Sequence, residues 1–421
     1  MRERSMRHNS LDQQIRQRAA RAIPGGMWGH MSARLLPESY PQFFARGEGC
    51  HLWDVDGNEY IDLMCSWGPM VLGHRHPVVQ AAAMKQLAEG DCMNGPSPLV
   101  VDLAERMIEL IPHADWAMFQ KNGSDATTSC VTIARAGTGR RKILAARGSY
   151  HGAVPWCSPS LVGVTSEDRA HVIQFEYNDI PSLEAAVQQA GNDLAGIIVT
   201  AFRHDLGRDQ QLPTQAFAEK LRAVCDRSDA ALILDDVRAG CRIDLGGSWE
   251  PLGVRPDLAA WSKAIANGFP LASVTGNDRF REAAASIYVT GSFWYGATSM
   301  AAALATLSVL EEDGVIGHMV KMGERLRNGF EALSRSHGIG IRQTGPVQMP
   351  MVLFEDDPDF RKGFLFCDAA LSRGAYLHPK HNMFLSGAHT EQDIDRVLDA
   401  ADFAMQQLVK SLQNEEVFQE N

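Results

Sequence analysis

Short apolar runs alternate with longer stretches of helical periodicity from about residue 120 of the chain onward. The clearest apolar runs cover residues 142–146, 196–200, 231–235, 258–262 and 271–275. Each run is apolar on both of the faces that a strand presents, which is typical of parallel strands buried between helices. The pattern therefore predicts an α/β fold with a central, mostly parallel sheet covered by helices.

The N-terminal part of the chain carries three local signals. Ser10 to Gln13 has the form of a capping box and opens a short helix, which Pro24 and the glycines after it end. Asp56-Gly57 between two apolar runs indicates a β-hairpin. Pro77 is expected at the first position of another helix.

The C-terminal part is helical in pattern from Met300 to about Phe330, then mixes strands with a terminal helix. Thr390 and Asp393 form a capping signature at the start of that helix. We expect a smaller α+β domain built from both chain ends. The expected boundaries are residues 1–80 for an N-terminal segment of the small domain, 81–320 for the large domain and 321–421 for the C-terminal small domain.

Composition and charge narrow the class of protein. The chain has 421 residues, 45% of them hydrophobic and 22% charged, with a net charge of -11. An acidic balance argues against a general binder of nucleic acids or anionic membranes. No apolar run approaches the roughly 20 residues of a transmembrane helix, and the charged N-terminus leads into no apolar signal core. We therefore expect a cytoplasmic protein without nucleic-acid or membrane partners.

Cysteine and histidine spacing gives no sign of a metal centre. The eight cysteines are scattered without a C-x-x-C pair, and the fourteen histidines include no H-E-x-x-H motif. Reduced cytosolic thiols and the absence of a metal site are the expectation.

Two sites at the ends of predicted strands could bind a charged ligand: the segment 122–126 could bind an anion, and Asp235 a cation. The segment from Asn122 to Ala126 places a Gly-Ser turn before a helical pattern that begins near Ala126, where free N–H groups and a hydroxyl suit a phosphate. Most such turns merely cap helices, so taken alone this signal is weak. Asp235 ends a buried strand, at the edge of the sheet where α/β proteins bind ligands. A cap or a salt bridge is the alternative.

Two further positions could carry chemistry. Lys263 follows the apolar run 258–262, and burial at a strand end would lower the pKa of its amine and make it a nucleophile. Most lysines are instead solvated surface residues. Tyr150 follows another strand and could stack on a planar cofactor, or pack in the core.

The order and spacing of these segments resemble the class III aminotransferases, which are pyridoxal-phosphate (PLP) enzymes of fold type I. The first third is most similar to glutamate-1-semialdehyde aminomutase. The matching segments are residues 23–26, 52–62, 66–69, 72–77, 122–126, 138–143, 150–152, 234–240, 256–258, 262–263 and 387–396. They span nearly the whole chain. The resemblance implies a large PLP-binding domain around a seven-stranded, mostly parallel sheet.

The resemblance also implies roles for individual residues. Lys263 matches the lysine that carries the cofactor as a Schiff base, and Asp235 matches the carboxylate that pairs with the pyridinium nitrogen. Val237 and Tyr150 match the side chains on the two faces of the cofactor ring.

A second group of matching residues concerns the cofactor's phosphate. Gly123 and Ser124 match the phosphate-binding turn. Ser292 falls where the family often has a threonine that reaches the phosphate of the neighbouring subunit. The resemblance therefore implies a homodimer with shared active sites.

Departures from the family pattern bear on the acceptor. Relatives that use 2-oxoglutarate carry an arginine near the C-terminal strand, and the matching position here is Leu385. We therefore expect pyruvate as the acceptor. Arg203 could bind the acceptor's carboxylate instead, or form a structural salt bridge.

Bulky residues replace small ones around the expected substrate pocket. Trp67, Phe293 and Trp294, with Met93, suggest an amine donor with a hydrophobic body, although core packing would explain any one of them. The segments at Phe293, at 378–386 and at 121–127 resemble a narrower group of aminotransferases. That group acts on long-chain amino polyols such as hydrolysed fumonisin, with pyruvate as acceptor.

Three functions are compatible with these features. The leading one is transfer of an amino group from an amine to a 2-oxo acid, pyruvate, by a ping-pong mechanism. An aminomutase like the glutamate-1-semialdehyde enzyme is the alternative. A PLP-binding protein without catalysis is disfavoured because the lysine, the aspartate and the phosphate turn are all present.

Overall fold

The computed structural model describes residues 8–419, and its centre is a seven-stranded sheet. The strands lie in the order β4-β10-β9-β8-β7-β5-β6. From β9 to β6 they run parallel, whereas β10 pairs antiparallel with both β9 and β4. Their bounds are β4 Trp116–Gln120, β5 Lys142–Ala146, β6 Val172–Phe175, β7 Leu194–Thr200, β8 Ala231–Asp235, β9 Leu258–Trp261 and β10 Ala272–Gly276. The mostly parallel sheet predicted from the apolar runs is confirmed.

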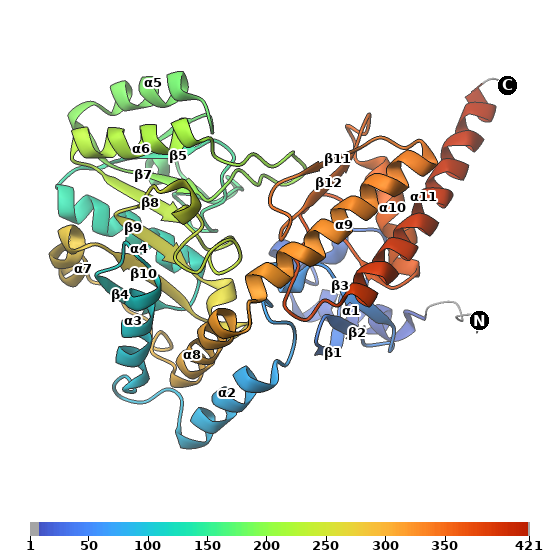
Figure 1. The fold of residues 1–421 in the computed structure, drawn as a ribbon, viewed down its shortest axis with the longest axis horizontal. Coiled ribbons are helices and arrows are strands. Elements are labelled where there is room, and N and C mark those ends of the chain that lie inside the picture. Colours follow the sequence, from blue (N-terminus) through green and yellow to red (C-terminus); the bar gives the residue numbers. More distant parts are fainter. Residues whose placement is uncertain (1–7, 420–421) are drawn as a thin grey trace.

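Helices cover both faces of this sheet (Figure 1). On β8, Leu232 and Leu234 join a core cluster with Phe217 of one helix layer, while Ile233 joins a second cluster with Cys130 of the other. Alternating side chains of a strand point to opposite faces, so a strand buried on both faces must be apolar throughout. This is the physical reason for the continuous apolar runs.

Helices alternate with the strands of the large sheet, as the sequence pattern predicts. The helices are α1 Ser10–Ala22, α2 Pro77–Glu89, α3 Leu99–Leu110, α4 Gly123–Thr138, α5 Ile180–Ala190, α6 Gln215–Ser228, α7 Arg281–Ser286, α8 Ala297–Glu312, α9 Val315–His337, α10 Arg361–Ser372 and α11 Glu391–Gln419. None of the helices within residues 8–419 combines the length and the apolarity that crossing a bilayer requires.

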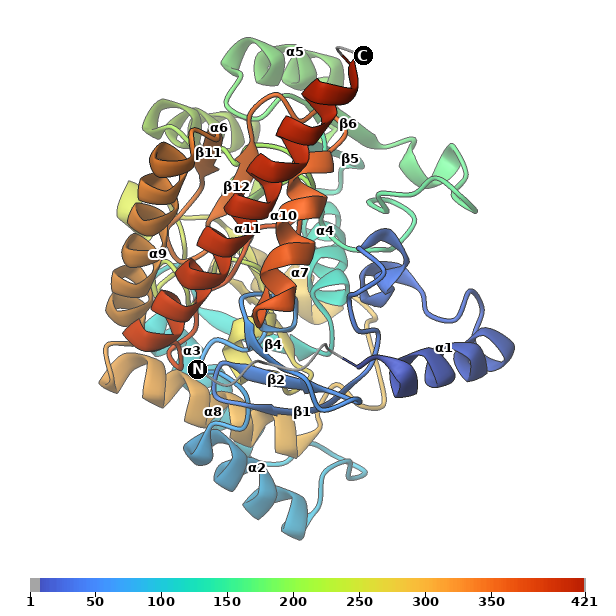
Figure 2. The ribbon, with the colours of Figure 1, turned by 90° about the vertical axis from the view of Figure 1, so that its right-hand side faces the viewer.

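A smaller α+β lobe combines both ends of the chain. Its four-stranded sheet has the order β1-β2-β3-β13, and the C-terminal β13 runs parallel to β3. The helices α9, α10 and α11 lie side by side in this lobe (Figure 2). The remaining strands are β1 Phe44–Glu48, β2 His51–Asp54, β3 Glu59–Asp62, β11 Ile341–Thr344, β12 Met351–Phe354 and β13 Ala375–Tyr376. The predicted fold class is confirmed, while the boundaries at residues 80 and 320 stay predictions.

Most of the predicted element starts are confirmed, and one is wrong. The hairpin of β2 and β3 turns at Asp56-Gly57, and α2 begins at Pro77. At α11 the Asp393 carboxylate accepts the N–H of Thr390 at 3.0 Å, and the Asp393 N–H donates to the Thr390 hydroxyl at 3.2 Å. The prediction of a capping box at Ser10 is wrong. The carboxylate of Asp56, in the hairpin, accepts the N–H groups of Leu11 and Asp12 at the start of α1 instead.

The Gly-Ser turn lies inside a helix rather than before it. The sequence predicts a helix from about Ala126, whereas α4 begins at Gly123, so Gly123 and Ser124 form its first turn. The Asp125 carboxylate accepts the N–H of Asn122 at 3.1 Å. The free N–H groups of the first turn therefore belong to the two residues expected to bind phosphate.

Candidate active site

Lys263 lies at the carboxyl end of β9 in a strained backbone conformation. It opens a short 3₁₀ turn, Lys263–Ala266, with a φ of 51°. This left-handed region is unfavourable for a residue with a side chain, and costs on the order of 1–3 kcal/mol. The preceding Ser262 holds the turn by donating its hydroxyl to the carbonyl of Leu271 at 2.8 Å. Such strain points to a position where the direction of the lysine side chain matters.

The surroundings of Lys263 favour its neutral amine. Burial, together with the charges of Arg238 and Arg242, lowers the pKa of Lys263 to about 7, although Asp235 acts in the opposite direction. Part of the side chain stays accessible. An amine that is largely deprotonated near neutral pH can act as a nucleophile or a base.

Asp235 is a buried carboxylate beside the same end of the sheet. It is the last residue of β8 and pairs in register with Thr200 on one side and Ala260 on the other. Its Oδ2 lies 2.8 Å from Nδ1 of His151, a buried residue. The other ring nitrogen of His151 is buried without a partner, which indicates that Nδ1 carries the proton and donates it to Asp235. The histidine therefore fixes the direction of the carboxylate.

The neighbouring Asp236 faces a different part of the protein. Its Oδ2 accepts the N–H of Ser248 at 2.8 Å. Burial raises the pKa of Asp236 to about 6. The two adjacent carboxylates are thus held by separate partners, and only Asp235 has a histidine.

The first turn of α4 packs closely against the residues expected around the cofactor. Gly152 has a φ of 125°, and a Cβ there would lie 2.5 Å from the hydroxyl oxygen of Ser124. A Cβ on Gly123 would lie 2.8 Å from a methyl carbon of Val237. Larger residues do not fit at either glycine without displacing a neighbour, so the turn, Val237 and the Tyr150–Gly152 segment form one cradle.

A left-handed turn brings Trp67 beside Lys263. Cys65, Ser66 and Trp67 all have positive φ angles, between 45° and 66°. Asp62 supports the turn by accepting the N–H of Cys65 at 2.9 Å. A Cβ on the next residue, Gly68, would lie 3.4 Å from Cδ of Lys263. The expected substrate residue Trp67 therefore lies at the lysine.

Four histidines that sequence reasoning missed surround this place. The Trp67 ring lies 5.0 Å from His30, 5.4 Å from His378 and 4.8 Å from His381, measured between ring centroids. Burial lowers the pKa of all three imidazoles, to about 4 for His378. Burial likewise lowers the pKa of His204, with further contributions from Arg238 and Lys263. These four imidazoles thus form a polar part of the lining that carries no charge of its own.

Arg203, expected at the substrate's carboxylate, already has a carboxylate partner. Its Nε and Nη2 lie 2.9 Å and 2.8 Å from Oδ2 of Asp205. Of the two alternatives given for Arg203 from the sequence, the structural salt bridge is the one observed. Leu385, at the position of the family's arginine, has its side chain fully buried in the core.

Within residues 8–419, no hydrogen bond or ring contact joins Ser292, Phe293 or Trp294 to Lys263. They form a turn in which Trp294 N–H donates to the carbonyl of Gly291, and the Phe293 side chain is 65% exposed. Among the described residues, no ring contact joins Phe293 or Trp294 to Trp67.

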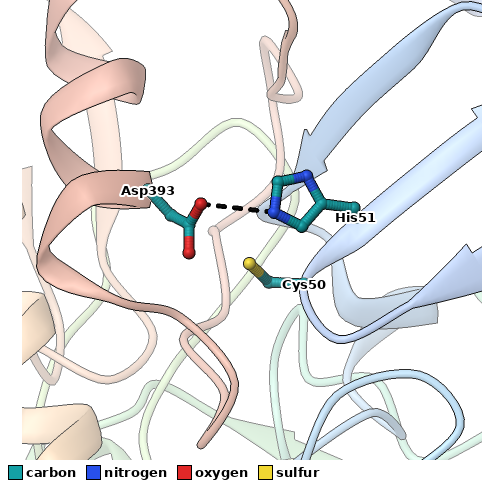
Figure 3. Close-up of side chains that lie close together, drawn as sticks. All are labelled: Cys50, His51 and Asp393. Atoms are coloured by element: carbon teal, nitrogen blue, oxygen red, sulfur yellow. Dashed lines mark ion pairs between the residues drawn. The ribbon is translucent and has the colours of Figure 1, made fainter.

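A cluster of Cys50, His51 and Asp393 has the residue types of a metal site (Figure 3). His51 Nε2 lies 3.2 Å from Asp393 Oδ1, while Asp393 Oδ2 accepts from Thr390. Burial, reinforced by Asp393, raises the pKa of the Cys50 thiol. A thiol that stays protonated is a poor ligand. Capping of α11 explains the cluster.

A buried lysine, a histidine-held aspartate and a helix N-terminus at one edge of this sheet define a PLP-dependent transferase of fold type I. A model of the family Aminotransferase class-III matches residues 36–390. The chain belongs to the class-III aminotransferases, and pyridoxal phosphate is its cofactor.

Individual relatives agree with this assignment. The chain is 47% identical over 405 residues to the aminopentol aminotransferase of Sphingopyxis macrogoltabida, covering 96% of each chain. It is 33% identical over 420 residues to the glutamate-1-semialdehyde 2,1-aminomutase of Desulfitobacterium hafniense, covering 93% of this chain and 97% of that one. The solved structure of the PLP internal aldimine form of the Sphingopyxis sp. MTA144 FumI protein superposes with a TM-score of 0.95, at 47% identity over 96% of this chain and 97% of that one. The resemblance found in the sequence is confirmed.

The residues at the site fit pyridoxal phosphate. Asp235 accepts from His151 Nδ1 and from the N–H of Val237, and within residues 8–419 no lysine or arginine forms an ion pair with it, so a pyridinium would supply the cation that this buried carboxylate lacks. We infer that Asp235 would hold the ring nitrogen, the turn of Gly123 and Ser124 the phosphate, and Lys263 the aldehyde carbon. Val237 and the half-exposed Tyr150 would flank the ring.

Exchange of Lys263 for methionine is expected to stabilise the cofactor-free protein. Because the folded-state pKa of Lys263 is about 7 and the unfolded value about 10.5, the unfolded chain binds more protons between these values. The wild type therefore gains stability as pH rises through this window, and Lys263 destabilises it most below pH 7. We expect Tm of Lys263→Met to exceed the wild-type Tm by a few degrees at about pH 6 and by less at about pH 9. A gain that grows with pH would show that the lysine is charged in the fold.

Proposed function

We propose that this aminotransferase takes an amino group from an amine whose chain carries hydroxyl groups and passes it to pyruvate, by a ping-pong mechanism. The observation that carries the proposal is the uncharged, hydrogen-bonding lining of imidazole and indole rings beside Lys263. The likeness to an aminopentol aminotransferase over 96% of both chains supports it.

Neutral imidazoles bind the hydroxyl groups of a substrate better than they bind charged groups of a substrate. A neutral imidazole offers one donor and one acceptor, which matches the two functions of a hydroxyl group. His378 accepts the N–H of Lys380 at its Nδ1, at 3.0 Å, which leaves its Nε2–H to donate to a ligand. His30 makes a ring contact with Trp67 and has no hydrogen bond to the other described residues, so both of its ring nitrogens are available to a ligand. The apolar face of Trp67 would contact the hydrocarbon part of the same donor.

The residues of the site divide the chemistry of transfer among themselves. Pyridoxal phosphate, when bound, supplies an electron sink that acidifies the proton on the amine-bearing carbon of the donor. The neutral Nζ of Lys263 accepts that proton and returns it, as a group with a pKa near the working pH can. Asp235, held by His151, keeps a negative charge at the ring nitrogen and so favours its protonated form.

The position of Leu385 supports pyruvate over 2-oxoglutarate. Its side chain is packed in the core, and its carbonyl accepts from Nη1 of Arg242 at 2.5 Å. Position 385 itself therefore supplies no cation for the second carboxylate of 2-oxoglutarate, and the nearby Arg242 already donates its terminal nitrogens to the carbonyls of Leu385 and Gly68. A monocarboxylic acceptor leaves no charge unpaired in this region.

The donor and acceptor are tested together in one screen. With aminopentol as donor, we expect alanine from pyruvate and a kcat/KM for pyruvate at least about tenfold above that for 2-oxoglutarate, since an unpaired buried carboxylate costs more than 1.4 kcal/mol. Amines without hydroxyl groups on the chain serve as the matched donors. Faster turnover with 2-oxoglutarate, or no preference for the hydroxylated donor, would contradict the proposal.

The aminomutase alternative rests on the relatives of that name at 33% identity. An aminomutase returns the amino group to the same molecule and needs no acceptor. Incubation of the holoenzyme with glutamate-1-semialdehyde alone separates the two. Isomerisation of the semialdehyde, with no alanine formed from any amine and pyruvate, would favour the aminomutase.

We also propose a homodimer in which the segment around Ser292 completes the partner's site. Tyr288 is 93% exposed and Phe293 65% exposed, in the same segment as the exposed Ser292. Several bulky aromatic side chains in one exposed segment are typical of an interface.

A charge placed in this segment is expected to disrupt the dimer. Phe293→Asp should shift the mass measured by light scattering toward the monomer and lower kcat at least about tenfold, because desolvating a carboxylate at an interface is unfavourable. Val162→Asp, on another exposed apolar residue, is the control. A fully active wild-type monomer would contradict the shared site.

A cytoplasmic location belongs to the same proposal. All eight cysteines lie within the described residues and remain as free thiols, which suits a reducing compartment. Cell fractionation with an antibody against the chain tests it.

A further inference from the structure

Arg238 follows Val237 directly and is directed into the same site. Its Nη1 donates to Nε2 of His381 at 3.1 Å and to Oδ1 of Asn382. Its guanidinium carbon lies 5.9 Å from the centre of the Phe384 ring. Nη1 thus donates both of its hydrogens within the protein, and His381 and Asn382 fix the direction of the Arg238 side chain.

Arg238 lies beside the reactive lysine. A Cβ on Gly68 would touch both the Phe384 ring, at 3.1 Å, and Cδ of Lys263, at 3.4 Å. Phe384 therefore links the guanidinium to the lysine through a short chain of contacts. The charge of Arg238 also contributes to the lowered pKa of Lys263.

The rest of the guanidinium has no partner. No carboxylate of the described residues lies within ion-pair distance of Arg238, and no hydrogen bond there uses its Nη2. Its Nε is buried without a partner. Burial lowers the pKa of Arg238 to about 10, so the cation is held at a cost. Buried charges are normally paired, and an open Nε–Nη2 edge has the geometry that binds a carboxylate with two parallel hydrogen bonds.

Two other arginines of the region lack such an open edge. In Arg203 both Nε and Nη2 are directed at Asp205. Arg242 also has an Nε without a partner, but the residue is fully buried and its Nη1 and Nη2 already donate to the carbonyls of Leu385 and Gly68, so it offers no free pair of nitrogens to a ligand. Arg238, in contrast, is only partly buried.

We propose that the Nε–Nη2 edge of Arg238 binds the carboxylate of the 2-oxo acid acceptor. The inference deepens the proposed function and rests on it. It explains how one site serves two unlike substrates: the acceptor's carboxylate pairs with Arg238, while the hydroxylated donor uses the neutral imidazoles and requires no anion. Arg238 is a specificity-determining residue for the acceptor half of the reaction.

The test compares acceptors with and without a carboxylate on the holoenzyme. In Arg238→Gln, kcat/KM for pyruvate is expected to fall about 30- to 100-fold, as loss of a charge-assisted pair predicts, while kcat/KM for propanal changes by less than about threefold. Arg238→Lys keeps the charge without the two-pronged edge and is expected to lose about tenfold with pyruvate. Equal losses with both acceptors would overturn the proposal.

Binding of oxamate, an unreactive pyruvate analogue, gives a readout that does not depend on turnover. Calorimetry on the holoenzyme is expected to show a Kd for oxamate raised in Arg238→Gln by the same factor as the loss in kcat/KM. Arg147→Gln, which removes an exposed arginine paired with Glu176, is the matched control for a lost charge. Should Arg238→Gln not fold, Arg238→Lys carries both measurements.

Two results assign the role elsewhere. If Arg238→Gln weakens cofactor binding or shifts the absorbance of the bound cofactor as strongly as it weakens oxamate, Arg238 serves the cofactor and the proposal is overturned. If Arg203→Gln shows the selective loss with pyruvate instead, the acceptor site lies at Arg203. Failure of the proposed function is recognised separately, because wild-type enzyme would then form no alanine from any donor while oxamate binding still reports on Arg238.

Discussion

Lys263→Ala is expected to lower kcat at least about 10⁴-fold, because in the proposed function one amine both carries the cofactor and moves the proton of the reacting carbon. The structure gives the amine a pKa of about 7 and places the Trp67 turn directly against its side chain. No other lysine of the described residues shares this position at the end of β9. The measurement is alanine formed from pyruvate and aminopentol at saturating concentrations of both.

Loss of structure has to be separated from loss of chemistry in this variant. Removing a buried amine with a lowered pKa is expected to leave the cofactor-free protein at least as stable as the wild type. Circular dichroism and Tm check this. Activity of a folded Lys263→Ala protein within tenfold of the wild type would show that another group moves the proton.

Asp235→Asn is expected to lower kcat about 10²- to 10³-fold, comparable with the loss of one charge-stabilising group in other active sites. The amide is nearly the same shape as the carboxylate and can still accept from His151 Nδ1, so the fold should be kept. What it removes is the negative charge that favours a protonated ring nitrogen. Single-turnover kinetics of the donor half-reaction, followed by absorbance, measures the effect.

The adjacent carboxylate provides the control for this exchange. Asp236 is buried like Asp235, but its Oδ2 accepts from the Ser248 N–H and has no histidine partner. Asp236→Asn is therefore expected to retain at least half of wild-type kcat. If the two variants lose activity equally, the effect of Asp235→Asn comes from packing rather than from its charge at the ring nitrogen.

The order of helices and strands could be predicted because each helix or strand has a local sequence pattern of its own. Strands buried on both faces have to be apolar throughout, so β8 could be read from Ala231 to Asp235 without knowledge of its neighbours. Pro77 and the Thr390–Asp393 pair mark helix starts through their own backbone chemistry. Local rules failed at Ser10, where a carboxylate from a distant hairpin caps the helix.

The substrate side of the site could not be predicted in the same way. Arg203 and Arg238 both follow a buried strand. Only the fold shows that Arg203 is paired with Asp205, whereas Arg238 has no carboxylate partner among the described residues. The histidines around Trp67 come from opposite ends of the chain, His30 from one and His378 and His381 from the other, so no spacing in the sequence connects them. The pair His378 and His381 was the available signal, since both lie within a segment that resembles the aminopolyol group.

The central claim is that Lys263 carries pyridoxal phosphate in an aminotransferase, and one measurement tests it most directly. Borohydride reduction of the holoenzyme fixes a lysine-bound cofactor covalently, and mass spectrometry of the digested protein then locates it. We expect one phosphopyridoxyl group per chain, on the peptide that contains Lys263, and its loss when aminopentol is added before the reductant. Labelling of another lysine would contradict the central claim, whereas labelling of Lys263 that aminopentol leaves unchanged would contradict only the proposed donor.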